Sequence, residues 1–267
     1  MHSMNQLTKL NKKNLIPVYI PNLPTSPVRL VITAGNVSAL KTPLNNLSIE
    51  VLNCQNNPFL EHSLASHADM LIHHLSNNTI LLDTEQTFLF DNLTKLEFNV
   101  KFISSRIKSP YPSDAYLNAA RIGHYLICNI KTTAPEILSA AEEMNLDIIA
   151  VKQGYTKCSI CVLNENTIIT EDIGINDACK AKGIDVLLIS KGSIKLSGHD
   201  YGFIGGCTGL IDKNKLAFCG DFRNHKDSKQ IDLFLAQHNI EPISLYAGDL
   251  LDIGGILPIL QENEFIC

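Results

Sequence analysis

A repeat of about 45 residues runs through this sequence and limits the folds that it can adopt. Four polar turns are each followed at once by a short apolar segment, and the turns are anchored on Asn78, His124, Asn166 and Asn214. The spacings between successive anchors are 46, 42 and 48 residues. The apolar segments after the anchors are predicted strands at 79–82, 125–128, 167–170 and 215–218.

Each repeat has the predicted layout strand, turn, strand, helix, strand. Helical stretches are predicted at 135–144, 175–182 and 228–238, and a weaker one at 85–93. Third strands are predicted after them, at 96–102, 146–151, 185–189 and 242–246. A first unit with a weaker signal comprises 28–33, 37–44 and 47–52. A unit of this kind cannot bury both its sheet face and its helix stripe alone, so the units must pack around something shared.

Five units around a pseudo-axis satisfy this requirement, and we predict one α/β domain over residues 1–267. The units are predicted at about 27–60, 64–104, 111–152, 153–196 and 198–260. A WD40-like propeller is a rival fold that the helices disfavour, and a tandem of two ordinary α/β domains is another. The Pro- and Ser-rich stretch 109–113 is too short to divide domains.

Composition excludes several classes of partner. The net charge of the 267 residues is -5 and no basic run exceeds Lys12-Lys13, so nucleic acid is not an expected partner. Every apolar run is too short for a membrane helix, and the first residues lack the features of a signal peptide. We therefore expect a cytoplasmic protein whose eight cysteines are reduced, with no cofactor and no metal, and we leave a homodimer open.

Four segments carry a resemblance to a known family: 111–114 leading to 117–120, 153–159, 198–206 and 252–258. On these the chain resembles the pentein fold, the fivefold β/α propeller of guanidino-group-modifying enzymes such as arginine deiminases, dimethylarginine hydrolases and amidinotransferases. The resemblance implies a pentein-like fold with a small-molecule pocket on the axis. Asp114 and Asn118 in the first segment, and Tyr155 in the second, are implied ligand-binding residues.

The chemistry of the resembled enzymes requires a Cys nucleophile, a His that moves protons, and carboxylates that grip a cation. The resemblance places the nucleophile after Gly254-Gly255, where this chain has Pro258. Cys267 lies nine residues further on and would serve only if the chain end folded back. Asn118 and Lys157 stand where the resemblance implies an acid and a His, so the pocket is expected to suit a neutral or anionic group better than a guanidinium.

The register of the repeat marks further candidates. His67, Tyr155 and Phe203 each stand eleven residues before their anchors, and a strand from His67 would turn Asp69 to the same side. On that geometry His67 and Asp69 would cooperate as a base and the group that orients it. The alternative is that the two residues only hold a loop by hydrogen bonds. Asp252 either accepts hydrogen bonds from a ligand or caps the last strand.

Cys158, Lys157 and His199 are the candidate catalytic residues. A neighbouring ammonium lowers the pKa of a thiol, although adjacent strand residues point to opposite faces. Cys158 and Cys161 also have a C-x-x-C spacing. This spacing suggests redox chemistry or half of a zinc site, and the alternative is a buried structural pair of thiols. His199 is the best isolated acid–base candidate.

Three functions follow from these residues. The leading hypothesis is a pentein-like protein that binds a polar ligand, or runs different chemistry, without the usual cysteine mechanism. The alternatives are an active amidine or guanidine hydrolase or amidinotransferase with a relocated Cys, and a structural protein that keeps only the fold.

Overall fold

The second apolar segment of each repeat is the central strand of a small sheet. The computed structural model describes residues 14–35 and 37–263. Four three-stranded sheets share one topology, in which the first strand pairs antiparallel with the second and the second pairs parallel with the third. Parallel neighbours need a crossover connection, which explains why a helix separates the second strand from the third.

The elements of these four units follow in chain order. The second unit contains α2 (Ala68–Leu71), β4 (Ile72–Ser76), β5 (Thr79–Leu82), α3 (Thr87–Lys95) and β6 (Asn99–Phe102). The third contains β7 (Ala120–Ile122), β8 (Tyr125–Cys128), α4 (Pro135–Glu143) and β9 (Asp147–Ala150). The fourth contains β10 (Ile160–Asn164), β11 (Thr167–Thr170), α5 (Ile173–Lys180) and β12 (Asp185–Leu188). The fifth contains η2 (Gly205–Cys207), β14 (Thr208–Asp212), β15 (Lys215–Phe218), η3 (Phe222–Asn224), α6 (Ser228–Gln237) and β16 (Glu241–Ser244).

The predicted central strands are confirmed as β5, β8, β11 and β15. The four predicted helices are confirmed to within two residues at each end. Local chemistry explains two of their starts. Pro135 occupies the first turn of α4, and the side chain of Asp172 caps α5 by accepting a 2.9 Å hydrogen bond from Ile175 N.

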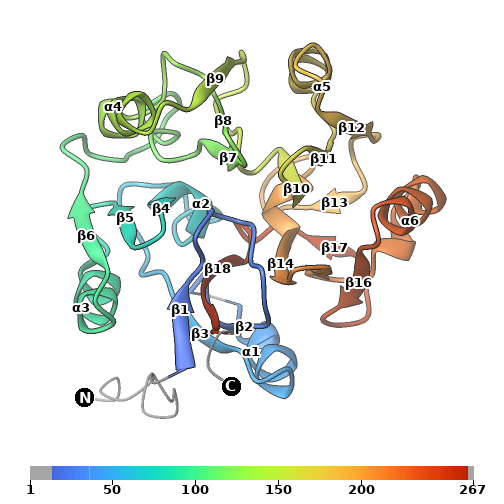
Figure 1. Cartoon of the computed structure of the whole chain (residues 1–267), viewed down its shortest axis with the longest axis horizontal. Coiled ribbons are helices and arrows are strands. Elements are labelled where there is room, and N and C mark those ends of the chain that lie inside the picture. Colours follow the sequence, from blue (N-terminus) through green and yellow to red (C-terminus); the bar gives the residue numbers. More distant parts are fainter. Residues whose placement is uncertain (1–13, 36, 264–267) are drawn as a thin grey trace.

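The first unit takes its antiparallel strand from the other end of the chain. Its sheet has the order β1 (Leu15–Pro17), β18 (Leu257–Glu262), β2 (Val28–Thr33) and β3 (Glu50–Asn53), with α1 (Ser38–Asn46) between β2 and β3. Residues 257–260, predicted to belong to the fifth unit, therefore lie in the first sheet. The first and last described strands, β1 and β18, pair in this sheet (Figure 1).

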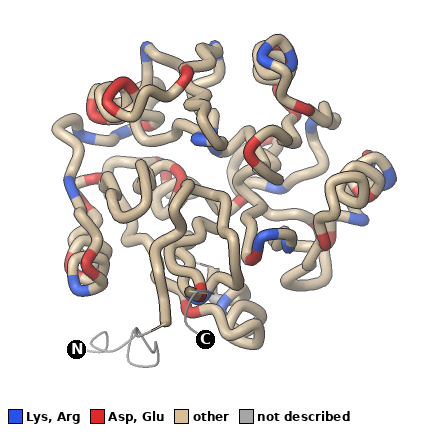
Figure 2. The backbone as a smooth tube through the Cα atoms, viewed as in Figure 1, with Lys and Arg blue, Asp and Glu red and all other residues tan. Residues whose placement is uncertain are grey.

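The five units surround a common centre, with α1, α3, α4, α5 and α6 on the outside (Figure 1). Between the fourth and fifth units, β13 (Ile194–Lys195) pairs in parallel with β17 (Leu250–Leu251). Charged residues of both signs are interspersed over the outer elements (Figure 2). Among the described residues, no helix has the length and apolar character needed to cross a membrane.

Candidate functional site

Tight turns precede the first strands of the second to fifth units and meet at the centre. They are α2, a turn closed by Asn118 N and Ala115 O, residues 156–159, and η2. Two backbone hydrogen bonds join neighbouring turns, since Thr156 N donates to Asn118 O and Gly206 N to Cys158 O, at 3.0–3.1 Å. Asp69 N donates to Gly254 O, in the segment before β18, at 3.0 Å. Side chains from residues far apart in the sequence are thereby brought together on the axis.

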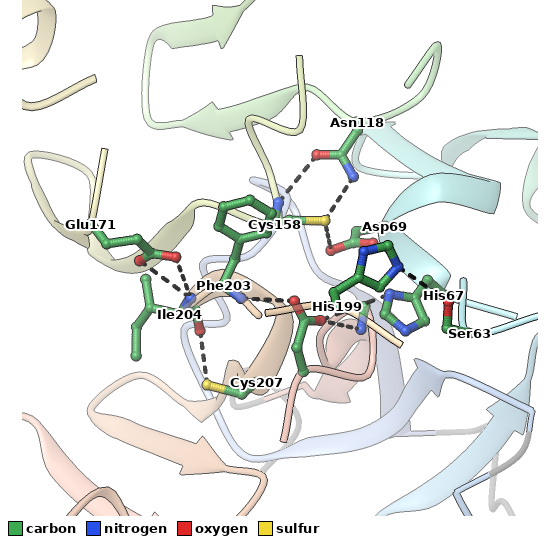
Figure 3. Close-up of polar contacts among 12 residues, drawn as sticks. Ser63, His67, Asp69, Asn118, Cys158, Glu171, His199, Phe203, Ile204 and Cys207 are labelled. Carbon is green, nitrogen blue, oxygen red and sulfur yellow. Dashed lines mark hydrogen bonds and ion pairs between the residues drawn. The ribbon is translucent and has the colours of Figure 1, made fainter. Parts of the chain in front are cut away.

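Cys158 lies at the middle of this arrangement (Figure 3). Its thiol donates to Asp69 Oδ2 at 2.9 Å and accepts a hydrogen bond from Asn118 Nδ2 at 3.0 Å. The Asn118 carbonyl oxygen accepts hydrogen bonds from the backbone N–H groups of Lys157 and Cys158, at 2.8 and 3.1 Å. Asn118 therefore holds both the turn and the sulfur in place.

The surroundings keep this thiol protonated. Cys158 is buried, and burial raises its pKa well above the ordinary value, as do the charges of Asp69 and Asp252. The hydrogen bond to Asp69 acts in the same direction, whereas the one from Asn118 lowers the pKa. Lys157 is not among the causes of this shift, and the net direction is opposite to the one expected from a neighbouring ammonium.

Asp252 is a second buried carboxyl on the axis. Its Oδ2 accepts a hydrogen bond from Phe203 N at 2.8 Å, and its Oδ1 accepts one from Gly254 N at 3.0 Å. His67 Nδ1 lies 3.8 Å from Oδ1. Burial, against the opposing charge of His67 and with a smaller contribution from Asp69, raises the pKa of Asp252 to about 6. Asp252 thus titrates close to neutral pH, as many functional carboxyls do.

These groups border a pocket of about 280 Å³. Five of the predicted site residues line it, namely His67, Tyr155, Cys158, His199 and Asp252. The remaining lining residues are mostly apolar or aromatic: Leu64, Met70, Leu196, Asp200, Tyr201 and Phe203. A concave, largely apolar cavity with a few polar groups is the usual form of a small-molecule site, and the volume of this one is just below the usual range of roughly 300–1,000 Å³.

Two more predicted residues have a place relative to this pocket: Asp114 contacts a residue of its wall, and His199 lies at its rim. Tyr155 OH donates to Asp114 Oδ2 at 2.9 Å, so Asp114 positions a ring of the pocket wall. Burial of Asp114 raises its pKa. His199 lies on the exposed rim, where its Nε2 is 3.2 Å from Ser63 Oγ (Figure 3).

Two local predictions were wrong. His67 is the residue before the short helix α2 and Asp69 lies within it, so the two do not face one side of a strand. Asp69 reaches Cys158 while His67 approaches Asp252. Lys157 and Cys158 lie in the turn before β10 and not in a strand. These short polar segments before the strands form turns because neighbouring segments accept hydrogen bonds from their backbone N–H groups, as Gly254 O does from Asp69 N and Asn118 O does from Thr156 N.

Lys157 also departs from its predicted role. Its side chain lines a separate cavity of about 20 Å³, together with Asp69, His73 and Pro258. The expectation of a neutral or anionic ligand relied on Asn118 and Lys157 together, and Lys157 does not line the pocket that Cys158 and Asp252 border. Pro258 lies in β18, and Cys267 lies outside the described residues.

Several pocket residues on loops were not predicted from the sequence, including Leu64, Leu196 and Tyr201. Loop positions carry no periodic signal that would place them near the axis. Phe203 carried such a signal, because its register matches that of His67 and Tyr155, and all three line the pocket. Among the described residues, no group of three or more His, Cys, Asp or Glu is placed to hold a metal ion.

Comparisons with known proteins support the fold and leave the activity open. A family of unknown function, DUF6873, matches residues 32–257. No curated protein matches the sequence. A structure of the dimethylarginine hydrolase DDAH from Pseudomonas aeruginosa, a cysteine-to-serine mutant complexed with citrulline, has a TM-score of 0.55 at 7% identity over 88% of this chain and 99% of that one.

Two further similar structures are of enzymes whose names give different substrates. The inosamine-phosphate amidinotransferase of Streptomyces griseus has a TM-score of 0.55 at 11% identity, over 92% of this chain and 97% of that one. The agmatine deiminase of C. jejuni has a TM-score of 0.53 at 13% identity, over 89% and 92%. These likenesses establish the pentein fold that the sequence predicted, and at such low identity they establish the fold alone.

Proposed function

This chain belongs to the family of unknown function DUF6873, and we propose that it binds a small molecule with hydrogen-bond donors in the axial pocket, without the covalent cysteine chemistry of the enzymes that share its fold. The observation that carries the proposal is the buried Asp252 carboxyl at a pocket whose only lining thiol among the described residues is held protonated.

Asp252 has capacity left for a ligand. Each of its oxygens accepts one backbone hydrogen bond, and a carboxylate oxygen can accept two. A charged donor placed between Asp252 and the aromatic walls would be desolvated, which strengthens the hydrogen bonds that it makes. The apolar lining, with Leu64, Met70 and Phe203, favours a ligand that has an apolar body behind its polar group.

Covalent catalysis by a cysteine has two requirements that this pocket does not meet. A thiolate is the nucleophile in that chemistry, and the Asp69 carboxylate beside Cys158 disfavours the thiolate. At the position where the resemblance implies the nucleophile, Pro258 has no group that can attack a substrate. Binding without a covalent step agrees with both observations.

Calorimetry and thermal shift with a panel of small molecules test the proposal. The panel contains amines, guanidino compounds including agmatine, citrulline, and small carboxylates, because citrulline and agmatine are named with two of the similar structures. A ligand that binds the native state raises Tm. Asp252→Asn should weaken its binding by about tenfold or more, the effect of losing a hydrogen bond to a charged group.

The matched control is Asp249→Asn, three residues away. Asp249 is half exposed and pairs with Lys195 at 2.6 Å, outside the pocket, so this variant should bind like the wild type. Leu196→Trp, which fills the pocket from its wall, should abolish binding even if Asp252→Asn folds poorly. The proposal fails if no compound binds, or if the pocket-filling variant binds as tightly as the wild type.

A relocated cysteine is the second candidate. Its support is the 2.9 Å contact from the Cys158 thiol to Asp69, which gives the proton a carboxylate acceptor. On this hypothesis Cys158 would attack an amidine carbon and pass its proton through Asp69 to the leaving amine. Release of ammonia or amine from the panel compounds, lost in Cys158→Ser, would favour this candidate over simple binding.

A further inference from the structure

Two loops from distant parts of the chain meet at the rim of the pocket. The 57–65 loop links the first and second units, and the 196–203 loop links β13 to η2. Both contribute walls, since Leu64 comes from the first loop and Leu196, Tyr201 and Phe203 from the second. A movement of either loop therefore changes the opening of the pocket.

One side chain joins the loops. His199 Nε2 lies 3.2 Å from Ser63 Oγ (Figure 3) and 3.7 Å from Glu61 Oε2. The 57–65 loop is itself anchored, because Glu61 N donates to Ser109 Oγ at 3.1 Å and Asn57 N donates to Ala65 O at 2.7 Å. His199 thus attaches the second loop to a fixed neighbour.

Apart from His199, the tip of the 196–203 loop has no comparable tie to another unit among the described residues. Residues 197–200 are exposed, and the loop is closed at its base by a 2.8 Å hydrogen bond from Gly202 N to Ile194 O. Within the part of the chain that the structure describes, every hydrogen bond or ion pair from residues 197–201 to another unit comes from His199. Tyr201 adds only ring contacts with Lys191 and Phe203.

We propose that the contact of His199 with Ser63 and Glu61 is a latch that controls access to the pocket. In the latched form the two loops narrow the rim above Cys158 and Asp252. Loss of the contact frees the tip of the 196–203 loop, and the pocket opens by a local motion that leaves the sheets intact. The latch has a role in ligand binding only if the proposed function holds, but its existence can be tested without a ligand.

Cys158 lines the pocket and reports on access to it. We would treat the protein with a small neutral thiol reagent at fixed pH and follow each cysteine by peptide mass spectrometry. In His199→Ala, the rate at Cys158 should rise about two- to tenfold, the change in open population expected from losing one exposed hydrogen bond. Hydrogen exchange should increase in 57–65 and 196–203 alone.

Two variants make the comparison selective. Ser63→Ala removes one partner without changing any charge near Cys158, and it should have the same effect in the same direction. His238→Ala is the matched control, because His238 Nε2 also pairs with a carboxylate, Asp185 Oδ2 at 3.0 Å, and does not line the pocket. Its Cys158 rate should equal that of the wild type.

The buried cysteines elsewhere, such as Cys128 and Cys179, report global unfolding. A rise confined to Cys158 supports the latch. A rise shared by all cysteines, or unchanged rates in both His199→Ala and Ser63→Ala, overturns it. Because no ligand is used, failure of the panel in the binding experiment leaves this result unaffected.

Discussion

Replacing Glu171 by glutamine should stabilise the protein at neutral pH. Glu171 is buried, and its carboxyl accepts a hydrogen bond from Ile204 N at 3.1 Å, next to the Phe203 N–H that Asp252 holds (Figure 3). Burial, with a smaller contribution from the charge of Asp252, raises the pKa of Glu171 from 4.5 to about 8, although the Ile204 hydrogen bond and the charge of Lys191 oppose the shift.

The sign of the effect follows from proton binding. Between pH 4.5 and about 8 the folded protein keeps the Glu171 proton and the unfolded chain releases it, so stability falls as the pH rises through this window. One pKa unit corresponds to about 1.4 kcal/mol, which makes the loss at pH 7 about 3 kcal/mol. A glutamine side chain at this position would stay neutral and can still accept from Ile204 N, so the variant avoids this loss.

The assay is urea unfolding at a series of pH values from 4.5 to 8. The wild type and Glu171→Gln should have equal free energies of unfolding near pH 4.5. As the pH rises the variant should become the more stable of the two, by about 2–3 kcal/mol at pH 7, or about 5–10 °C in Tm. Glu165→Gln, at an exposed glutamate in the turn before β11, should follow the wild type. Parallel profiles for the wild type and Glu171→Gln would mean that the buried carboxyl is ionised, and would refute the reasoning.

Three further predictions concern the centre. Gly206→Ala should fail to fold or lose more than about 3 kcal/mol of stability in thermal unfolding, because a Cβ there would overlap the Asp252 carboxyl; wild-type stability would contradict this. Asn118→Ala should cost about 2–4 kcal/mol in urea unfolding, since it leaves the amide of Cys158 unpaired and removes the 2.8 Å hydrogen bond of the Lys157 amide, and a cost below about 1 kcal/mol would be inconsistent with that role. At pH 7, iodoacetamide should alkylate Cys158 more slowly than a free thiol, as judged by mass spectrometry, and an equal or faster rate would show a stabilised thiolate.

Local patterns predicted the elements well and the site in part. The strands 79–82 and 167–170 follow from apolar runs bounded by turn residues, which form strands regardless of their distant neighbours. The register of the repeat also brought His67, Tyr155 and Phe203 to equivalent places, and all three line one pocket. Equivalent positions in repeated units face the same centre, so this part of the site was contained in the spacing.

The remainder depended on contacts between units. Sequence adjacency suggested that Lys157 activates Cys158, but the turn sends the two side chains to different cavities. Burial is the largest cause of the raised pKa of Cys158, and the side chain that adds most to it is Asp69, 89 residues away. Spacing within a repeat says nothing about which side chain of another unit comes within hydrogen-bond distance.

The sequence by itself determined the strands and helices of the repeating units, because they follow from local apolar periodicity and turn chemistry, and the resemblance of four of its segments implied the pentein fold. Only the tertiary structure decided that the C-terminal strand β18 completes the first sheet, that Cys158 stays a thiol, and that His199 lies on the rim against Ser63. The physical reason is that the electrostatics and hydrogen bonding of a site are set by burial and by atoms within a few ångströms, whichever unit supplies them.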